Sequence, residues 1–192
     1  MTIYRLSMSP MVRPPLTLEH ALLGLLRAQP MHAYEMHQRL EHAEALGLVW
    51  HIKQSHLYAL LARLEEDGYI AGETEPQGNR PPRRVLHLTP EGEAVFTRWL
   101  RTPVAHGRDF RQEFLAKLFF AQQEGPETVA HLIAAQRAAC QEWLASLGTQ
   151  AARLGAQRPY DWLVLQFRIS TLEAILRWLE ICAETLVPAA AP

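Results

Sequence analysis

The chain has 192 residues, 48% of them hydrophobic, and a formal net charge of −1. This composition excludes a disordered chain and a protein with a global basic field, so any contact with nucleic acid has to come from local clusters of positive charge. The longest apolar runs, such as residues 21–26, are too short to span a bilayer. Cys140 and Cys182 fit free buried thiols in a reducing compartment better than a disulfide or a metal site.

The first part of the chain predicts a tail followed by two helices. Residues 1–15 contain three prolines and no long hydrophobic region, so we expect a flexible tail without a signal peptide and a cytoplasmic protein. A first helix, with Thr17 placed to cap it, is expected to run to about Ala28 and to turn four leucines inward: Leu18, Leu22, Leu25 and Leu26. A second helix is expected from about His32 to Ala45, and its inner stripe is Tyr34, His37 and Leu40.

The stretch from Lys53 to Ile70 predicts the helix around which the rest of the chain is organised. Its leucines recur at three- and four-residue spacing and define one inner side: Leu57, Leu60, Leu61 and Leu64. Ser55 or Gln54 is placed to cap its start, and Gly68 to end it. Polar groups remain near its N-terminus, namely Lys53, Gln54, Ser55, His56 and Tyr58. Such groups are typical of a recognition helix that reads base edges in a major groove, whereas the alternative is an ordinary solvated helix start.

A β-hairpin is predicted after this helix. Residues 69–75 and 84–88 read as two strands, joined by a turn-rich segment at 76–83. Three arginines lie in or beside this turn and can reach a phosphate backbone or a minor groove: Arg80, Arg83 and Arg84. They can also be residues that only keep a loop soluble. With three short helices before it, the hairpin predicts a winged helix-turn-helix.

The remainder of the chain is predicted to be helical. Thr89-Pro90-Glu91 supplies a cap, a proline at the first helical position and an acidic first turn. Residues 103–108 read as a linker. The final helix carries a heptad seam, the pattern of helices packed almost parallel. Because this helix is apolar on two flanks, we expect a second subunit to cover it, with dimerisation through Phe114, Leu118, Trp162, Leu165, Ile169, Leu172, Leu176 and Leu179.

Other kinds of site have weak signals. Nine histidines are present, but no Cys/His pair has zinc-finger spacing and there is no HExxH motif, so we expect no metal. The chain has no nucleophile elbow, no phosphate-binding glycine loop and no paired acidic motif, so we expect no enzyme and no cofactor. The aromatic residues of the C-terminal half can either line an effector pocket or form plain packing: Phe110, Phe114, Trp143, Trp162, Phe167 and Trp178.

Several blocks of the sequence, taken in order, resemble the PadR family of transcriptional regulators. They are ALLGLL (21–26), HAYEM (32–36), SHLYALLARLE (55–65), GYI (68–70), RPPRR (80–84) and LTPEG (88–92). The helical remainder is similar to the longer subfamily with a multi-helix C-terminal dimerisation domain. Ala33 stands where the family usually has glycine, and Leu86-His87 replaces the commoner aromatic pair of the second wing strand, which bears on how the wing packs.

The resemblance implies a mainly α fold in three parts: a flexible tail at 1–15, a winged helix-turn-helix DNA-binding domain at 16–102, and an antiparallel helical dimerisation domain at 109–187. It also implies a homodimeric repressor on an inverted-repeat operator in double-stranded DNA, in some members released by a small aromatic ligand. Tyr34, Tyr58 and the wing arginines match positions where the family contacts DNA. The rival hypothesis is a winged-helix protein-interaction module without sequence-specific DNA binding.

Overall fold

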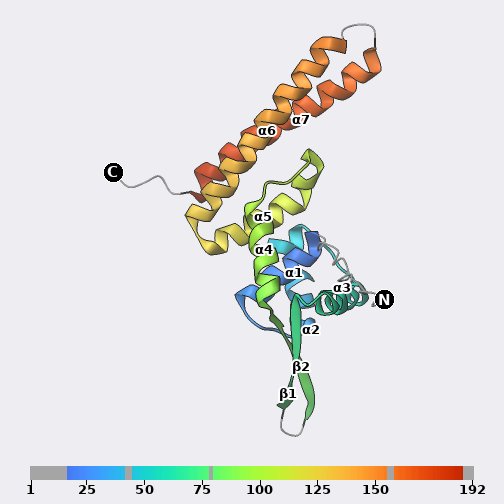
Figure 1. Cartoon of the computed structure of the whole chain (residues 1–192), viewed down its shortest axis with the longest axis vertical. Coiled ribbons are helices and arrows are strands. Elements are labelled where there is room, and N and C mark those ends of the chain that lie inside the picture. The colour runs from blue at the N-terminus through green and yellow to red at the C-terminus, as the bar shows by residue number, and fades with distance from the viewer. Residues whose placement is uncertain (1–16, 42–44, 78–79, 155–157, 188–192) are drawn as a thin grey trace, which may run out of the picture. The chain divides into compact units, whose positions relative to one another are not determined.

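The computed structural model describes residues 17–41, 45–77, 80–154 and 158–187 (Figure 1). They form two compact units, the first made of residues 17–41 and 52–96 and the second of residues 45–51 and 97–187. The tail expected at 1–15 lies outside the described residues.

The first unit begins with α1 (Thr17–Ala28), α2 (Ala33–Glu41) and α3 (Gln54–Glu66). The inner face predicted for α3 is confirmed, because all four of its leucines are buried. The inner stripe predicted for α2 is wrong at one position: His37 and Leu40 are buried, but Tyr34 is 60% exposed. Tyr34 lies in the first turn of α2, and its hydroxyl oxygen accepts a hydrogen bond from the Gln38 amide at 3.1 Å instead of packing in the core.

The second predicted helix is shorter than expected. We expected it to continue to Ala45, but α2 ends at Glu41, and Ala45–Leu48 form a separate 3₁₀ helix, η1. Residues 42–44 lie outside the described residues. Leu46 is buried, and its carbonyl accepts hydrogen bonds from the backbone N–H groups of Val49 and Trp50 at 2.9 and 3.0 Å. Residues 45–50, which precede α3, therefore form a structured turn.

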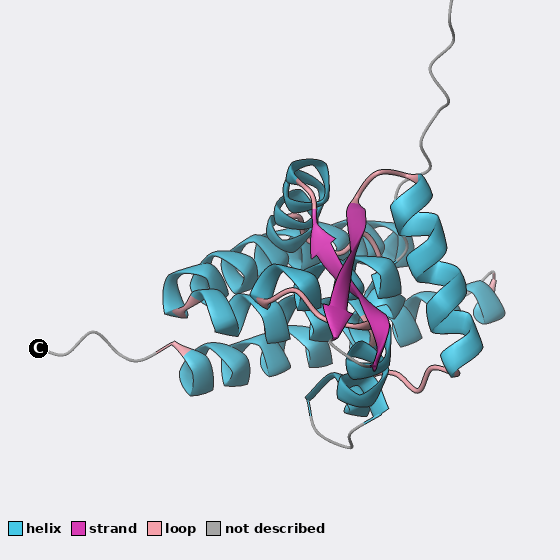
Figure 2. Cartoon of the chain, turned by 90° about the horizontal axis from the view of Figure 1, so that it is seen from below, coloured by secondary structure: helices cyan, strands magenta, loops and turns pink. Residues whose placement is uncertain are grey.

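The hairpin consists of β1 (Ile70–Gln77) and β2 (Arg80–Leu88), which pair antiparallel and twist around each other (Figure 2). Both strands extend into the segment 76–83 that we predicted as a turn. The register is continuous from Ile70↔Leu88 to Glu75↔Arg83 and shifts before Gln77↔Arg80. This irregularity lies opposite two prolines of β2, which have no N–H group for a regular ladder.

A capped turn joins α3, the hairpin and α4 (Pro90–Arg101). Gly68 ends α3 with φ +78°, as its position predicted. The hydroxyl oxygen of Thr89 accepts a hydrogen bond from the Gly92 N–H at 3.1 Å and donates one to the Gly68 carbonyl at 2.8 Å. The predicted cap is thus confirmed. Gly92 packs against the backbone carbonyl of Tyr69. A Cβ at position 92 would collide with that carbonyl and would also lie 2.7 Å from Leu88 Cδ1.

The second unit consists mainly of α5 (Glu113–Glu124), α6 (Pro126–Leu154) and α7 (Pro159–Leu186). The long helices α6 and α7 lie side by side (Figure 1). Leu165, Leu172 and Leu179, spaced seven residues apart on α7, are buried. These three positions of the predicted heptad seam therefore pack inside the single chain, and the spacing suits two helices with nearly parallel axes.

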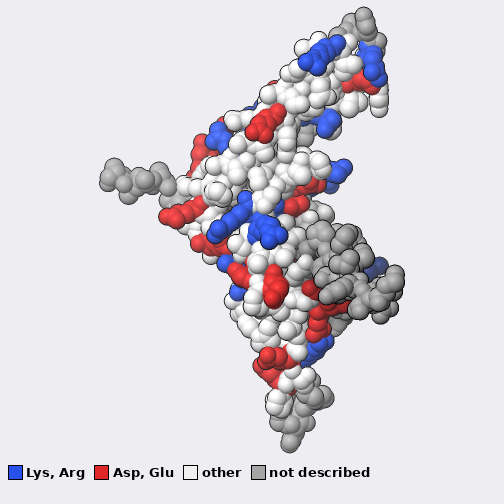
Figure 3. Space-filling model, in the orientation of Figure 1, with Lys and Arg blue, Asp and Glu red and all other residues white. Residues whose placement is uncertain are grey.

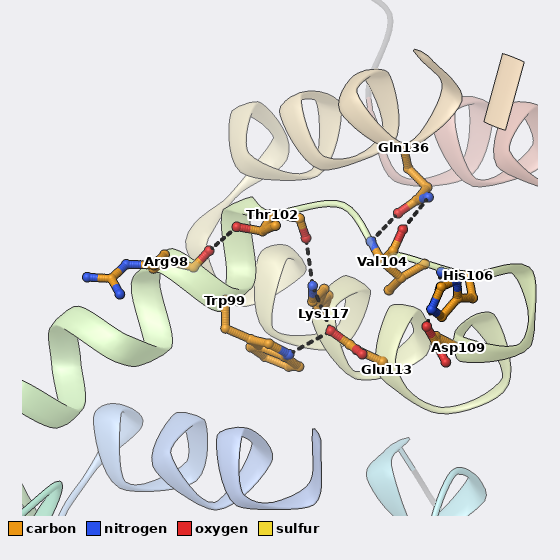
Figure 4. Close-up of polar contacts among 9 residues, drawn as sticks. All are labelled: Arg98, Trp99, Thr102, Val104, His106, Asp109, Glu113, Lys117 and Gln136. Atoms are coloured by element: carbon orange, nitrogen blue, oxygen red, sulfur yellow. Dashed lines mark hydrogen bonds and ion pairs between the residues drawn. The ribbon is translucent and has the colours of Figure 1, made fainter. Parts of the chain in front are cut away.

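The segment predicted as a linker is fixed to the second unit (Figure 4). Val104 is buried, its N–H donates to Gln136 Oε1 at 2.8 Å, and its carbonyl lies 3.5 Å from Gln136 Nε2. Residues Gly107–Arg111 then form a 3₁₀ helix, η2, in which the His106 N–H donates to the Asp109 carboxylate at 3.1 Å. Because a buried amide satisfies both backbone groups of Val104, this segment is part of the core and not a free connection.

A buried charged cluster lies beside it (Figure 4). Lys117 Nζ lies 2.9 Å from the Glu113 carboxylate, donates to the Thr102 carbonyl at 2.6 Å and sits 5.2 Å from the centre of the Trp99 ring. The Trp99 indole N–H donates to the same Glu113 oxygen at 3.0 Å. Burial lowers the pKa of Lys117, and the contacts with Glu113 oppose that shift. The last turn of α4 is thus bound to α5 through a desolvated ammonium group.

Candidate nucleic-acid interface

The start of α3 presents a row of polar side chains to solvent. Lys53 is the N-cap, with extended backbone angles, and its carbonyl accepts the N–H groups of His56 and Leu57 at 2.9 and 3.1 Å. The predicted capping by Ser55 or Gln54 is therefore wrong, because both residues lie inside the first turn. Their side chains point away from the core, and all five predicted base-reading residues are exposed: Lys53, Gln54, Ser55, His56 and Tyr58.

Two contacts fix α3 within the first unit. Arg63 forms an ion pair with Glu19 of α1, whose side chain is fully buried. His37 Nε2 lies 3.1 Å from the Ile52 carbonyl, just before α3 begins, and its Nδ1 lies 3.4 Å from Glu41. Since an unpaired buried carboxylate would be strongly destabilising, the Glu19–Arg63 pair ties α3 to α1. Both ends of α3 are thus held while its polar start stays exposed.

A groove of about 820 Å³ lies between the first turn of α2, one face of α3 and β2. Tyr34 and Tyr58 face it from the two helices, and they are 60% and 46% exposed. On α3, Tyr58, Leu61, Ala62 and Glu65 line it at three- and four-residue spacing, which places them on one side of the helix. The predicted residues Tyr34, Tyr58, Arg83 and Arg84 are therefore brought together around one concave surface.

Arg84 is held by groups that the sequence analysis did not select. Its guanidinium pairs with Oε1 of Glu65 on α3, and the same oxygen accepts the Gly72 N–H of β1 at 3.2 Å. The Arg84 carbonyl lies 2.8 Å from Nδ1 of His32. Glu65 belongs to the acidic C-terminal turn of α3, together with Glu66. The structure places it beneath the hairpin, and no spacing within α3 alone signals a partner 19 residues later in the chain.

The hairpin carries both signs of charge. Arg83 is exposed and has no ion-pair partner among the residues described. Glu75 lies opposite it in the register, and Glu73 lies 3.7 Å from His87. The side chain of Arg80 lies outside the described part of the chain, although its backbone pairs with Gln77. Figure 3 shows basic and acidic side chains interspersed on the visible face, so any attraction for an anion is local.

The residues predicted to dimerise fall into two groups in the second unit. Phe114, Leu165, Leu172 and Leu179 are buried within the single chain. Phe114 stacks on Phe110 with ring centres 4.8 Å apart and meets the edge of Trp178 at 5.8 Å. Leu118, Ile169 and Leu176 are half-buried, and Trp162 is exposed. Their role in dimerisation stays a prediction, and the first group already has partners in its own chain.

Other apolar side chains of α7 are more open than the predicted seam. They are Tyr160, Leu163, Val164, Phe167 and Ile181, with Phe167 74% exposed. Phe167 was predicted either to line an effector pocket or to form plain packing, and it was not among the residues predicted to dimerise. The spacing of the seam could not show which flank α6 covers, because both flanks are apolar.

Metal sites and membrane-spanning helices are two further features to consider in this chain. Among the described residues, no group of three or more His, Cys, Asp or Glu side chains is arranged to hold a metal ion. Across the described part of the chain, every helix is too short or too polar to span a bilayer.

The sequence was compared with protein families and with individual proteins. The profile of the Transcriptional regulator PadR-like family matches residues 22–98, and that of Virulence activator alpha C-term matches residues 110–187. The Negative transcriptional regulator PadR of Bacillus subtilis (strain 168) is 30% identical over 103 residues, 54% of this chain and 56% of that protein, so the match spans little more than half of that relative. The Probable transcriptional regulator Rv1176c of Mycobacterium tuberculosis (strain ATCC 25618 / H37Rv) is 26% identical over 190 residues, 89% of this chain and 98% of that protein.

Among solved structures, the crystal structure of Bacillus subtilis PadR in complex with operator DNA covers 89% of this chain and 99% of that chain, with 24% identity and a TM-score of 0.45. The PadR-like match covers the second half of α1, then α2, α3, the hairpin and most of α4, and the second match runs from the end of η2 through α7. Residues 22–98 thus carry a PadR-like transcriptional regulator domain, and residues 110–187 carry a helical domain of the kind described as Virulence activator alpha C-term.

Proposed function

We propose that this chain is a repressor that binds an inverted-repeat operator as a homodimer. The observation that carries the proposal is the exposed polar start of α3, from Lys53 to Tyr58, beside a hairpin that carries arginines. Side chains at the start of a recognition helix can reach base edges in the major groove, and a wing can reach the flanking phosphates. Tyr34 at the first turn of α2 is exposed toward the same groove and is a further candidate for a phosphate contact.

The repressing role is supported by the relative in Bacillus subtilis, a negative transcriptional regulator. The homodimer is supported by the open apolar side chains of α7, of which Phe167 and Tyr160 are the most exposed. Large apolar side chains exposed together on one helix are candidates for an interaction site. Two copies related by a two-fold axis would present their recognition helices to successive major grooves, which gives the operator its inverted repeat.

The proposal includes release of the operator by a small aromatic compound bound to the helical unit. It is supported by the family resemblance and by aromatic side chains that are still open, since Phe110, Phe114 and Trp178 pack on one another while Trp162 and Phe167 are exposed. Addition of hydroxycinnamic or benzoic acids to the operator complex is expected to raise the apparent Kd for DNA. Unchanged affinity across such a panel would remove the effector from the proposal.

The test is selection of DNA by the full-length chain from a random-sequence pool, followed by gel shift on the enriched duplex. We expect an inverted repeat with half-site centres about one helical turn apart. If each protomer neutralises roughly three to five phosphates, log affinity falls with log salt at a slope of about −5 to −9. A pool without enrichment, or an affinity that does not depend on salt, would contradict DNA recognition and favour the protein-interaction module.

The dimer has its own measurement. Phe167→Glu is expected to shift the purified chain from dimer to monomer in light scattering at micromolar concentration, because it buries a charge in the proposed interface. Arg177→Glu, at an exposed position on another side of the same helix, is the control for acidic charge added to α7. A wild-type chain that is monomeric in dilute solution would contradict the proposal.

A further inference from the structure

We propose that the Glu65–Arg84 ion pair positions the hairpin β1–β2, the wing, against α3. We call this pair the brace. Glu65 is its positioning residue, and Arg84 serves in the brace and not as a contact to DNA. The inference rests on the proposed function, since it states which groups set the wing against the recognition helix. It divides the wing arginines into one that holds the hairpin and others that are available to phosphates.

The first support is that one carboxylate oxygen joins three elements. Oε1 of Glu65 on α3 pairs with the Arg84 guanidinium of β2 and accepts the Gly72 N–H of β1 at 3.2 Å. The hairpin is covalently connected to α3 only through the short turn at Gly68 and Tyr69. A second connection from the last turn of α3 to both strands restricts how the hairpin can rotate about that turn.

The second support is the space left for the Arg84 side chain. A Cβ at position 72 would lie 2.7 Å from both Cζ and Nη2 of Arg84, so the guanidinium lies directly over the backbone of β1. The backbone of Arg84 is held as well, because its carbonyl lies 2.8 Å from His32 Nδ1 at the start of α2. Met31, the residue before His32, bridges to Leu86 through two backbone hydrogen bonds of 3.2 and 3.0 Å. Arg84 is therefore fixed at its main chain and at its guanidinium.

The third support is electrostatic. The Arg84 and Glu65 side chains are 57% and 32% exposed, so they are near enough to the surface for a phosphate to approach. A phosphate that took Arg84 would have to displace or lie beside the Glu65 carboxylate, and like charges at that separation repel. Arg83 has no ion-pair partner among the described residues, so its charge is not offset in this way.

The two roles of Arg84 predict opposite signs for Glu65→Ala. If Arg84 contacts a phosphate, removal of the neighbouring carboxylate tightens DNA binding. If the pair is a brace, the same change loosens the hairpin, and we expect about five-fold weaker binding to the duplex selected by the wild-type full-length chain. Arg84→Ala is expected to weaken binding by a similar factor without changing the salt slope, and the double variant by no more than either single one.

Matched variants separate the brace from a general structural defect. Glu65→Gln keeps an oxygen that can accept from Gly72 and Arg84, and it should restore most of the affinity. Arg83→Ala should reduce the salt slope by about one per protomer and should add to the effect of Glu65→Ala, because it removes a different interaction. Tighter binding by Glu65→Ala, or a salt slope lowered by Arg84→Ala, would overturn the brace.

A measurement without DNA keeps this inference distinguishable from the proposed function. In amide hydrogen exchange followed by NMR, Glu65→Ala in the full chain should speed exchange at Gly72 and along β1 and leave the buried face of α3 unchanged. If the wild-type chain selects no DNA, the proposed function fails, while faster exchange at Gly72 still supports the brace. Exchange at Gly72 that is unchanged in Glu65→Ala would overturn it whatever the DNA result.

Discussion

The two compact units each contain a cation paired with a glutamate, and the two pairs differ in their surroundings. In the second unit the side chains of Lys117 and Glu113 are 1% and 23% exposed, and in the first unit those of Arg84 and Glu65 are 57% and 32% exposed. The ammonium of Lys117 has a carboxylate, a backbone carbonyl and an aromatic face around it. The Arg84 guanidinium keeps much of its contact with water.

The difference in exposure decides how much each pair contributes to the free energy of unfolding. Burial removes Lys117 from water, which lowers its pKa, so the cluster is tolerated only while every partner is in place. An exposed pair such as Arg84–Glu65 contributes little to the free energy of unfolding because water and salt screen it. Its geometric effect is the orientation of a hairpin. The same type of ion pair therefore holds buried groups together at Lys117 and orients a hairpin at Arg84.

The largest effect is expected for Lys117→Ala. The change leaves the Glu113 carboxylate and the Thr102 carbonyl without their shared donor in a desolvated site. We expect the free energy of unfolding to fall by about 3–5 kcal/mol, as for other buried pairs that lose one partner. Chemical denaturation followed by circular dichroism measures this loss, with the second unit's helices supplying most of the signal.

The matched control is Arg84→Ala, which removes the cation of the exposed pair. Its cost to the free energy of unfolding should stay below about 1 kcal/mol, even though it is expected to weaken DNA binding. Equal losses of stability in the two variants would break the comparison, because burial would then not decide what the pairs contribute.

A smaller effect is expected at alkaline pH from Cys182, one of the two buried thiols of the second unit. Burial raises the pKa of Cys182 to about 11, from 9.0 in the unfolded chain. The unfolded thiol therefore ionises first, and its contribution to stability, present below pH 9, is lost as the pH rises through about 11. Allowing for solvent screening, we expect the loss to be about 1–2 kcal/mol.

The measurement is the free energy of unfolding of wild type and Cys182→Ala from pH 8 to 11. The difference between the two proteins should shrink as the pH rises, since the variant has no thiol to ionise. Lys117 changes the free energy of unfolding in the opposite direction, and it does so in both proteins. Its lowered pKa lets the folded state lose the buried charge at a lower pH than the unfolded state. A constant difference across this range would mean that the Cys182 thiol is not desolvated in the folded protein.

The sequence patterns were sufficient where a feature depends on neighbouring residues. The inner face of α3 follows from the spacing of its leucines, and the end of α3 follows from Gly68. The cap of α4 follows from Thr89 and Pro90, because a capping hydroxyl and a proline act within one turn of the helix. Composition and these local signals also predict the order of helices and hairpin that the structure confirms.

Features that depend on contacts across the chain could not be predicted in this way. Glu65 and Arg84 are 19 residues apart, and Gln136 bonds the Val104 backbone from 32 residues away. Tyr34 has the spacing of an inner residue but lies in the first turn of α2, where its side chain is exposed. The apolar flanks of α7 have similar patterns, so the flank covered by α6 is decided by tertiary packing.

The smallest effect is expected at the turn that joins the elements of the first unit. Thr89→Ala removes the cap from the Gly92 N–H and the hydrogen bond to the Gly68 carbonyl. We expect a loss of about 1 kcal/mol in the free energy of unfolding, whereas Thr89→Ser keeps the hydroxyl and should lose less than half of that. Because these neutral hydrogen bonds lie near solvent, a loss as large as that of Lys117→Ala would show that the turn at Thr89 is desolvated like the Lys117 cluster. A loss near 1 kcal/mol, together with unchanged exchange of the Gly72 amide, would locate the orientation of the hairpin in the Glu65 brace and not in the cap.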